Sequence, residues 1–315
     1  MKTEELLERY AAGERDFSGS KLHRLNLEEV NLSGANLSGA SFEGSYLNDA
    51  DLSHANLSNA RLGSVTLLGA NFEGADLSNA SLQDAQAEYV NFKAANLSYV
   101  KFSTDLTGSD FSYADLSNSY MDHTWLEKVN LSYANLSNIS TYQTTFERVN
   151  LRGANLSNAF LSDGTSLRKA NLIAANLTGM KIGEVMTGTF YDSETIIDEK
   201  TRFSAYGINI LDYGIDIFEE AIFIGAGENL KYVDLESADL SDMDLSETNL
   251  SYANLKSANL SGSILFQVNL ESADLEGADL TDADLEGANM KDVNLYNVIF
   301  CNTLMPDGTI RNDDC

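Results

Sequence analysis

The densest group of reactive side chains in this 315-residue chain is a set of seven carboxylates between positions 271 and 286. Closely spaced carboxylates can act as general acids and bases, or as ligands for hard cations such as Ca²⁺. Their spacing matches no dedicated cation-binding loop. Acidic side chains are abundant throughout the chain, so their presence here does not indicate catalysis. The group instead predicts an acidic interaction surface made of Glu271, Asp274, Glu276, Asp279, Asp282, Asp284 and Glu286.

The other residues with catalytic or metal-binding potential do not form a recognisable site. His23, His54 and His123 share no spacing suited to a metal, and none lies near a cysteine. The run Gly225–Gly227 begins like a dinucleotide-binding fingerprint, but Leu230 stands where that fingerprint requires glycine. Serine is abundant, yet no G-x-S-x-G nucleophile elbow occurs. We therefore expect no catalytic residues, no metal site and no cofactor.

The charge of the chain limits the partners that it can bind. With 48 acidic and 20 basic side chains, the formal net charge is −28. Nucleic acids and anionic membranes both need a cationic face, so direct binding to either is not expected. No run approaches the ~18–20 apolar residues of a membrane span. The segment 1–16 lacks the apolar core of a signal peptide, so a cytoplasmic location is the default expectation.

A five-residue repeat encodes the elements that must position these side chains. Residues 35–39 read Ala-Asn-Leu-Ser-Gly, and residues 273–277 read Ala-Asp-Leu-Glu-Gly. A period of five fits neither a helix nor a flat strand, but it fits two inward-facing residues followed by a polar corner. We expect stacked coils in which nearly every backbone N–H pairs with the next coil. This pairing explains why the chain contains a single proline.

The tandem pattern Ala-(Asn/Asp)-Leu-x-x resembles the pentapeptide repeat protein family over most of the chain. This resemblance implies an all-β fold, a right-handed quadrilateral parallel β-helix with four pentapeptides in each coil. A coil of four such repeats would stack Phe72 on Phe92, with Phe111 next after a one-residue slip in the register. It would also align a column of alternating charge, which favours neighbouring strands: Glu236, Lys256 and Glu276.

The repeats divide the chain into five parts. A capping helix spans residues 1–16, the first β-helical stack spans 17–182 and the second spans 230–300. The segment 183–229 separates the two stacks, and a terminal cap spans 301–315. Thr3 is expected to cap the helix, and Gly13 to end it. Its apolar stripe of Leu6, Leu7 and Tyr10 predicts a lid over the first coil, with a partner-binding helix as the alternative. The interrupting segment is either a protruding loop or a degenerate continuation of the coil.

Two cysteines lie in the terminal cap and nowhere else in the chain. Cys301 and Cys315 bracket the turn at residues 305–308. This ending resembles that of cyanobacterial pentapeptide proteins, in which paired cysteines clamp the last coil. The resemblance implies a disulfide between them, with two free thiols as the alternative. A disulfide would favour an oxidising compartment, such as the periplasm or the thylakoid lumen, over the cytoplasm.

The lack of reactive groups and the long repetitive surface predict a non-enzymatic scaffold that binds an unidentified protein partner. The resemblance supplies an alternative, an acidic DNA mimic that binds a topoisomerase such as DNA gyrase, as quinolone-resistance proteins of the family do. Those relatives dimerise through a C-terminal helical module, which residues 301–315 do not resemble. We therefore expect a monomer or a weak homodimer. A structural or divalent-cation-buffering role is a third hypothesis.

Overall fold

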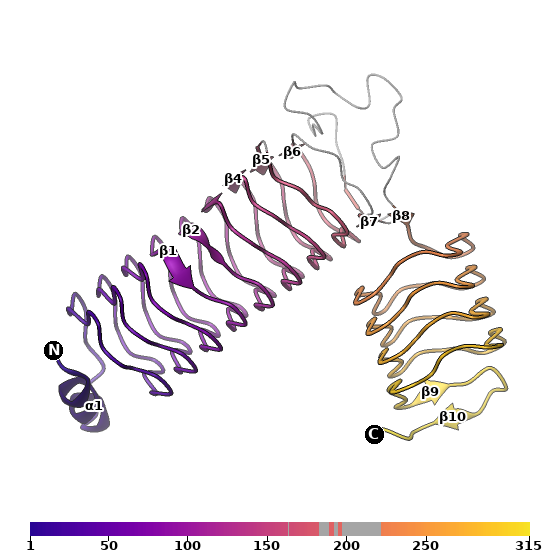
Figure 1. Cartoon of the computed structure of the whole chain (residues 1–315), viewed down its shortest axis with the longest axis horizontal. Helices are drawn as coiled ribbons and strands as arrows, with labels where there is room; N and C mark the ends of the chain where they lie inside the picture. The colour runs from indigo at the N-terminus through magenta and orange to yellow at the C-terminus, as the bar shows by residue number, and fades with distance from the viewer. Residues whose placement is uncertain (163, 183–188, 192–194, 197–221) are drawn as a thin grey trace. The chain divides into compact units, whose positions relative to one another are not determined.

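The chain forms the expected all-β fold, a right-handed quadrilateral parallel β-helix preceded by one short helix (Figure 1). The computed structural model describes residues 1–162, 164–182, 189–191, 195–196 and 222–315. These residues fall into two compact units, the first containing residues up to 189 with 195–196, and the second containing 190–191 with 222–315. Most of the predicted interrupting segment, 183–229, lies outside the described residues, so its path stays a prediction.

Successive coils are held together by backbone hydrogen bonds between corresponding residues of neighbouring coils. The Leu37 N–H donates to the Asn56 carbonyl at 2.7 Å, and the Asn56 N–H donates to the Ala35 carbonyl at 2.9 Å. Parallel bridges with the same step, such as Asn36 with Asn56 and Asp239 with Asn259, recur through both units. Four five-residue sides therefore make one coil, and an interior coil satisfies its backbone groups through the coils on either side.

Most sides are too short to form more than an isolated bridge, and one side of the first unit pairs over longer stretches. It carries a six-stranded parallel sheet: β1 (Ser81–Gln86), β2 (Lys101–Asp105), β3 (Tyr120–Asp122), β4 (Ser140–Tyr142), β5 (Phe160–Leu161) and β6 (Lys181–Ile182). The second unit contains a parallel pair and an antiparallel pair: β7 (Phe190–Tyr191) with β8 (Ile222–Phe223), and β9 (Thr303–Leu304) with β10 (Ile310–Arg311).

The core of each unit is a column of buried apolar side chains inside the coils. The large central residue and the small residue two positions earlier both face inward, as in the buried pair Ala35 and Leu37. The predicted phenylalanine stack is confirmed, with ring centroids 5.3 Å apart for Phe72 and Phe92 and 4.7 Å apart for Phe92 and Phe111. This continuous stack removes three aromatic side chains from water, which stabilises the coils that contain them.

The one-residue slip that precedes Phe111 is absorbed on the sheet side. The pairing of β1 with β2 shifts between Gln83 and Gln86, and on the sides that follow the step between bridged residues is one position shorter, as from Asn91 to Asp110. Such a shift is a β-bulge, in which one extra residue on one strand is left without a partner. The slip therefore changes the local pairing without interrupting the stack of coils.

The N-terminal helix α1 (Thr3–Ala11) covers the first coil, but the expected cap is wrong. Lys2 occupies the N-cap position, and no side chain caps the helix there. The Thr3 hydroxyl instead donates to the Asn26 carbonyl of the first coil at 3.0 Å. Leu6 is fully buried, and the Tyr10 hydroxyl donates to the Ser33 carbonyl at 2.8 Å. These contacts support the lid interpretation.

At the other end, the chain folds back over the last coil. A disulfide joins Cys301 to Cys315, whose Cα atoms are 4.9 Å apart. The Asp314 N–H donates to the Phe300 carbonyl at 3.0 Å, and the Phe300 N–H donates to the Asp314 carboxylate at 2.9 Å. The Arg311 guanidinium lies 3.7 Å from the centre of the Phe300 ring. The terminal segment thereby covers backbone groups that an open stack would expose.

Candidate interaction surface

Two neighbouring sides of the first unit carry polar ladders that the fold itself uses. The Asn135 side-chain amide donates to Asp115 on the preceding coil at 2.9 Å, and that of Asn155 donates to Asn135 at 3.1 Å. The side-chain oxygen of Asn135 also accepts the Ser137 N–H at 3.2 Å, which shapes the corner. Because each side chain bonds both its own turn and the next coil, these ladders are largely occupied with holding the coils together.

The predicted acidic surface winds around one coil instead of forming a patch on one face. Asp274, Asp279 and Asp284 are five residues apart, so they lie on three successive sides, and each bridges a different column. Their carboxylates accept the N–H groups two residues ahead, at 3.2, 2.8 and 2.9 Å respectively. We call the seven predicted residues Glu271, Asp274, Glu276, Asp279, Asp282, Asp284 and Glu286 the acidic belt.

Two lysines from neighbouring coils neutralise part of the acidic belt. Lys291 lies 2.8 Å from Glu271, and Lys256 lies 3.3 Å from Glu276 and 3.2 Å from Asp274. The hydrogen bond from Lys291 holds the pKa of Glu271 below its ordinary value. At Asp274, partial burial raises the pKa of the carboxyl group. The hydrogen bonds from the Glu276 N–H and Lys256 lower it by more, so the pKa of Asp274 lies below its ordinary value. These carboxylates are thus engaged by the protein itself.

The histidines are dispersed in the structure as they are in the sequence. His123 lies on the sheet side, where its Nδ1 is 2.6 Å from Asp122 and its ring meets Tyr142 edge to face at 5.7 Å. Over the parts of the chain that the structure describes, no three His, Cys, Asp or Glu side chains are grouped so as to hold a metal ion.

The strongest departure from the polar ladders lies on the sheet side of the first unit. At the bridging position, where the two ladder sides carry mostly Asn or Asp, this side carries serine, cations and aromatic residues. We call this set the sheet column, and its members in order are Lys21, Ser41, Arg61, Ser81, Lys101, Tyr120, Ser140, Phe160 and Lys181. Its backbone pairs normally, since the Arg61 N–H donates to the Ala40 carbonyl at 2.9 Å.

The sheet column collects cations that are scarce elsewhere in this acidic chain. Among the described residues that bridge parallel coils, the four Lys and Arg side chains all belong to it. Arg61 lies 3.6 Å from Glu43, and the Arg61 side chain is 64% exposed. Lys21, Lys101 and Lys181 are also exposed. An exposed ion pair contributes little to stability, so these cations are available for a ligand at low cost to the fold.

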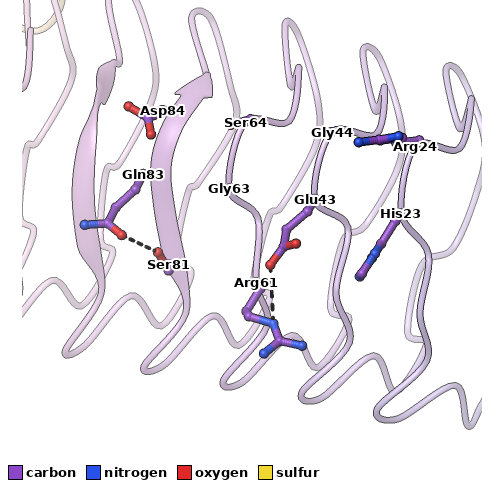
Figure 2. Close-up of a pocket in the computed structure, with 10 residues that line it drawn as sticks. All are labelled: His23, Arg24, Glu43, Gly44, Arg61, Gly63, Ser64, Ser81, Gln83 and Asp84. Carbon is purple, nitrogen blue, oxygen red and sulfur yellow. Dashed lines mark hydrogen bonds and ion pairs between the residues drawn. The ribbon is translucent and has the colours of Figure 1, made fainter.

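A pocket of about 580 Å³ opens beside the cationic half of the sheet column (Figure 2). Figure 2 shows four consecutive coils contributing side chains, with the Glu43–Arg61 pair and the Ser81–Gln83 hydrogen bond drawn between them. The lining of the pocket consists of His23, Arg24, Glu43, Gly44, Arg61, Gly63, Ser64, Ser81, Gln83 and Asp84.

The other half of the sheet column exposes aromatic side chains. Tyr120 on β3 and Phe160 on β5 are 41% and 48% exposed. Tyr142 follows on β4, and Trp125, on the next side of the coil, is 55% exposed. Large aromatic residues left in water on a rigid sheet are typical of surfaces that another protein covers.

Sequence reasoning missed this surface because it followed the density of charge along the chain. The useful signal was periodic: at a step of one coil, corrected for the slips, Lys21, Arg61, Lys101 and Lys181 fall in one column. The step of one coil decides which residues are neighbours on the surface of a β-helix. Carboxylates that are close in sequence therefore spread over several sides of the coil, while residues a whole coil apart in sequence lie next to each other on the same side.

Comparisons with known proteins agree with this architecture. Pentapeptide repeats match the chain at residues 16–49, 26–63, 55–87, 70–103, 89–132, 130–164, 146–182, 229–265 and 263–302. A search of the curated proteins finds no match. No helix among the described residues has the length and hydrophobicity needed to cross a membrane.

Several solved structures are similar to this chain. HetL, a pentapeptide repeat protein involved in heterocyst differentiation regulation from the cyanobacterium Nostoc sp. strain PCC 7120, is 24% identical, with 99% of this chain and 100% of that chain covered and a TM-score of 0.42. QnrB1, a plasmid-mediated fluoroquinolone resistance protein, is 19% identical, with 62% and 100% covered and a TM-score of 0.42. A pentapeptide repeat protein from the Arabidopsis thaliana thylakoid lumen is 29% identical, with 34% and 68% covered and a TM-score of 0.22.

Proposed function

The chain belongs to the pentapeptide repeat family, and from this premise we propose that it is a non-enzymatic scaffold that binds a protein partner through its sheet column. The observation that carries the proposal is the exchange of ladder residues for exposed cations and aromatic side chains along one side of the first unit. The fold does not require these side chains, since the backbone pairs there as it does elsewhere. A rigid surface with charged and aromatic groups suits protein recognition.

Two features of the surface favour binding over chemistry. The cations of the sheet column are held at fixed spacings on a rigid β-helix, with Lys21, Arg61 and Lys101 on alternate coils, so a partner would meet a preformed array and little of its binding energy would be spent on ordering it. The pocket beside them is lined by both charge signs, the cations Arg24 and Arg61 and the carboxylates Glu43 and Asp84, of which Arg61 and Glu43 form an ion pair. Such an arrangement can orient a polar ligand without enclosing a reacting atom.

The proposal is tested by affinity capture from a lysate of the source organism at ~50 mM and ~500 mM salt, conditions that bracket the screening of surface charge. The wild-type chain is compared with Arg61→Glu/Lys101→Glu in the sheet column and with Glu271→Gln/Glu286→Gln in the acidic belt. We expect a protein that wild type and the belt variant retain and that the column variant loses. Capture that survives the column variant but not the belt variant would overturn the proposal.

The second candidate, an acidic DNA mimic that binds a topoisomerase such as DNA gyrase, would use the acidic belt. It is supported by the net charge of −28 and by the exposed carboxylates of Asp282 and Glu286. The lysines paired with Glu271 and Glu276 count against it, because a mimic of a phosphate backbone needs unneutralised charge. In the capture experiment this candidate predicts a topoisomerase that depends on the belt and is lost at high salt.

We also propose that the chain works in an oxidising compartment such as the periplasm or the thylakoid lumen. Its support is the Cys301–Cys315 disulfide, because structural disulfides are rare where thiols are kept reduced. Rapid alkylation of cells followed by mass spectrometry tests this. Protection of both cysteines from alkylation is expected, and full alkylation of both in the untreated cell would contradict the assignment.

A further inference from the structure

Large cationic side chains alternate with serine along the first half of the sheet column. Ser41 separates Lys21 from Arg61, and Ser81 separates Arg61 from Lys101, each one coil apart. Ser41 is buried and Ser81 is half-buried, so the cations project above the serines between them. A ligand lying along the column therefore meets positive charge on every second coil.

The same alternation continues into the aromatic half. Ser140 on β4 separates Tyr120 on β3 from Phe160 on β5. The half-buried Ser140 lies lower than the two exposed rings on either side of it. The alternation breaks twice, where Lys101 is followed directly by Tyr120 at the shortened coil and where Phe160 is followed directly by Lys181. Projecting groups thus recur on alternate coils within each half of the column, from Lys21 to Lys101 and from Tyr120 to Phe160.

This spacing can be compared with the repeat distances of protein chains. Coils ~4.8 Å apart place groups on alternate coils ~9.6 Å apart. A polyproline II helix rises ~3.1 Å per residue with three residues per turn, so its same-side residues recur every ~9.3 Å. Same-face residues seven apart on an α-helix are ~10.5 Å apart. On a β-strand, same-face residues recur at ~6.7 Å or ~13 Å. The polyproline II repeat is the best match.

We propose that the sheet column binds an extended, proline-rich segment of a partner protein that carries a carboxylate at every third residue. This inference rests on the proposed scaffold function and names the class of partner. The carboxylates meet Lys21, Arg61 and Lys101, while prolines pack against the rings of Tyr120 and Phe160, as aromatic grooves recognise polyproline II chains elsewhere. Seven coil steps from Lys21 to Phe160 span ~34 Å at ~4.8 Å each. About 11 residues in polyproline II conformation cover that length.

The net charge of −28 does not prevent an acidic segment from binding here. Charges on exposed surfaces are screened beyond ~8–10 Å at physiological ionic strength, so a ligand on the column responds mainly to nearby groups. Lys21, Arg61 and Lys101 outnumber the two carboxylates at the pocket, Glu43 and Asp84. Displacement of the exposed Glu43–Arg61 pair by a ligand carboxylate costs little, for the reason given above.

The test uses the full chain and a fluorescein-labelled peptide of four Glu-Pro-Pro repeats, with binding followed by fluorescence anisotropy. Two peptides of equal length are the matched probes: Glu-Gly-Gly repeats keep the charge and lose the polyproline II conformation, and Lys-Pro-Pro repeats keep the conformation and reverse the charge. We expect Glu-Pro-Pro to bind at least about tenfold more tightly than either. We also expect the affinity to fall between ~50 mM and ~500 mM salt.

Variants of the protein locate the binding. Arg61→Glu/Lys101→Glu should weaken Glu-Pro-Pro binding by about tenfold or more, since it reverses two contacting charges. Lys93→Glu/Lys128→Glu changes the net charge equally on exposed residues outside the column and should leave binding within about twofold. Tyr120→Ser/Phe160→Ser should weaken binding while preserving its salt dependence.

Each other result overturns the inference. Equal loss in Arg61→Glu/Lys101→Glu and Lys93→Glu/Lys128→Glu would mean that only overall charge matters. Equal affinity for Glu-Gly-Gly repeats would show that the polyproline II conformation is not required. Tighter binding of a helical peptide with glutamate at every seventh residue would show that the column binds an α-helix instead. If no peptide binds but captured protein still depends on the column, the inference fails while the scaffold proposal stands. If capture is also independent of the column, both fail.

Discussion

The Asn/Asp ladders make a sharp prediction, because an asparagine can donate to the coil before it and an aspartate cannot. Asn135 donates to Asp115 at 2.9 Å, and Asn155 donates to Asn135 at 3.1 Å. Asn135→Asp therefore removes a hydrogen bond and sets two carboxylates side by side. Asn155→Asp removes the same kind of bond but meets the neutral amides of Asn135 and Asn176. The two sites share the local sequence Ala-Asn-Leu-Ser-Asn.

The two variants are expected to differ by the electrostatic repulsion between Asp115 and the carboxylate introduced at position 135. Two unit charges ~4 Å apart repel by ~1 kcal/mol in water and ~4 kcal/mol at an effective dielectric constant near 20. Asp115 and Asn135 are half-buried, so the lower part of this range applies. We expect the free energy of unfolding to be lower in Asn135→Asp than in Asn155→Asp by about 1–2 kcal/mol at pH 7.

The assay is urea denaturation of both variants and wild type, followed by circular dichroism from pH 7 to pH 3. Repulsion raises the folded-state pKa of the introduced carboxyl at position 135, so its penalty is present above that pKa and is lost as the pH falls below it. The gap between the variants should therefore close near pH 4, where carboxyl groups titrate. Equal stabilities at pH 7, or a gap independent of pH, would refute the ladder reasoning.

Three further outcomes follow from the structure. Phe92→Ala should lower the free energy of unfolding by about 3–5 kcal/mol, since it removes the middle of the phenylalanine stack; a loss below about 1 kcal/mol in urea titration would contradict close packing there. Breaking the Cys301–Cys315 disulfide with Cys315→Ser should cost about 3 kcal/mol in non-reducing urea titration, and reductant should then have no further effect. Lys291→Met should return the lowered pKa of Glu271 toward its ordinary value in an NMR titration. The Lys291–Glu271 pair stabilises the fold above the unfolded-state pKa of Glu271, and this stabilisation is lost as the pH falls through the folded-state pKa. An unchanged pKa of Glu271 in the variant would show that the pair does not form in solution.

Most of the fold could be predicted from the sequence because one short rule is repeated many times. Central residues such as Leu37, and small residues such as Ala35, specify an inward-facing pair, and the preceding Asn or Asp specifies the ladder. The stacking of Phe72, Phe92 and Phe111 followed from the five-residue repeat together with the four-repeat coil that the family resemblance implied. Predictions of this kind succeed because each depends on local pattern and a fixed period.

Features that depend on one contact were less predictable. Thr3 has the residue type of a helix cap, but the nearby Asn26 carbonyl on the first coil captures its hydroxyl. The acidic belt is dense in sequence, yet the corner after each fifth residue turns Asp274, Asp279 and Asp284 onto different sides. The sheet column went unnoticed for the converse reason, since its members are a whole coil apart in sequence and only the folded coil brings them together.

The central claim is that a protein partner docks on the sheet side of the first unit. A photo-crosslinking amino acid at Gln83 or at Glu73, introduced in the source organism, tests it most directly. Both residues are exposed and directly follow a buried central residue, but they lie half a coil apart in sequence, on opposite corners. We predict a crosslinked protein from position 83 and none from position 73. Crosslinks of equal yield from both positions, or from position 73 alone, would contradict the account.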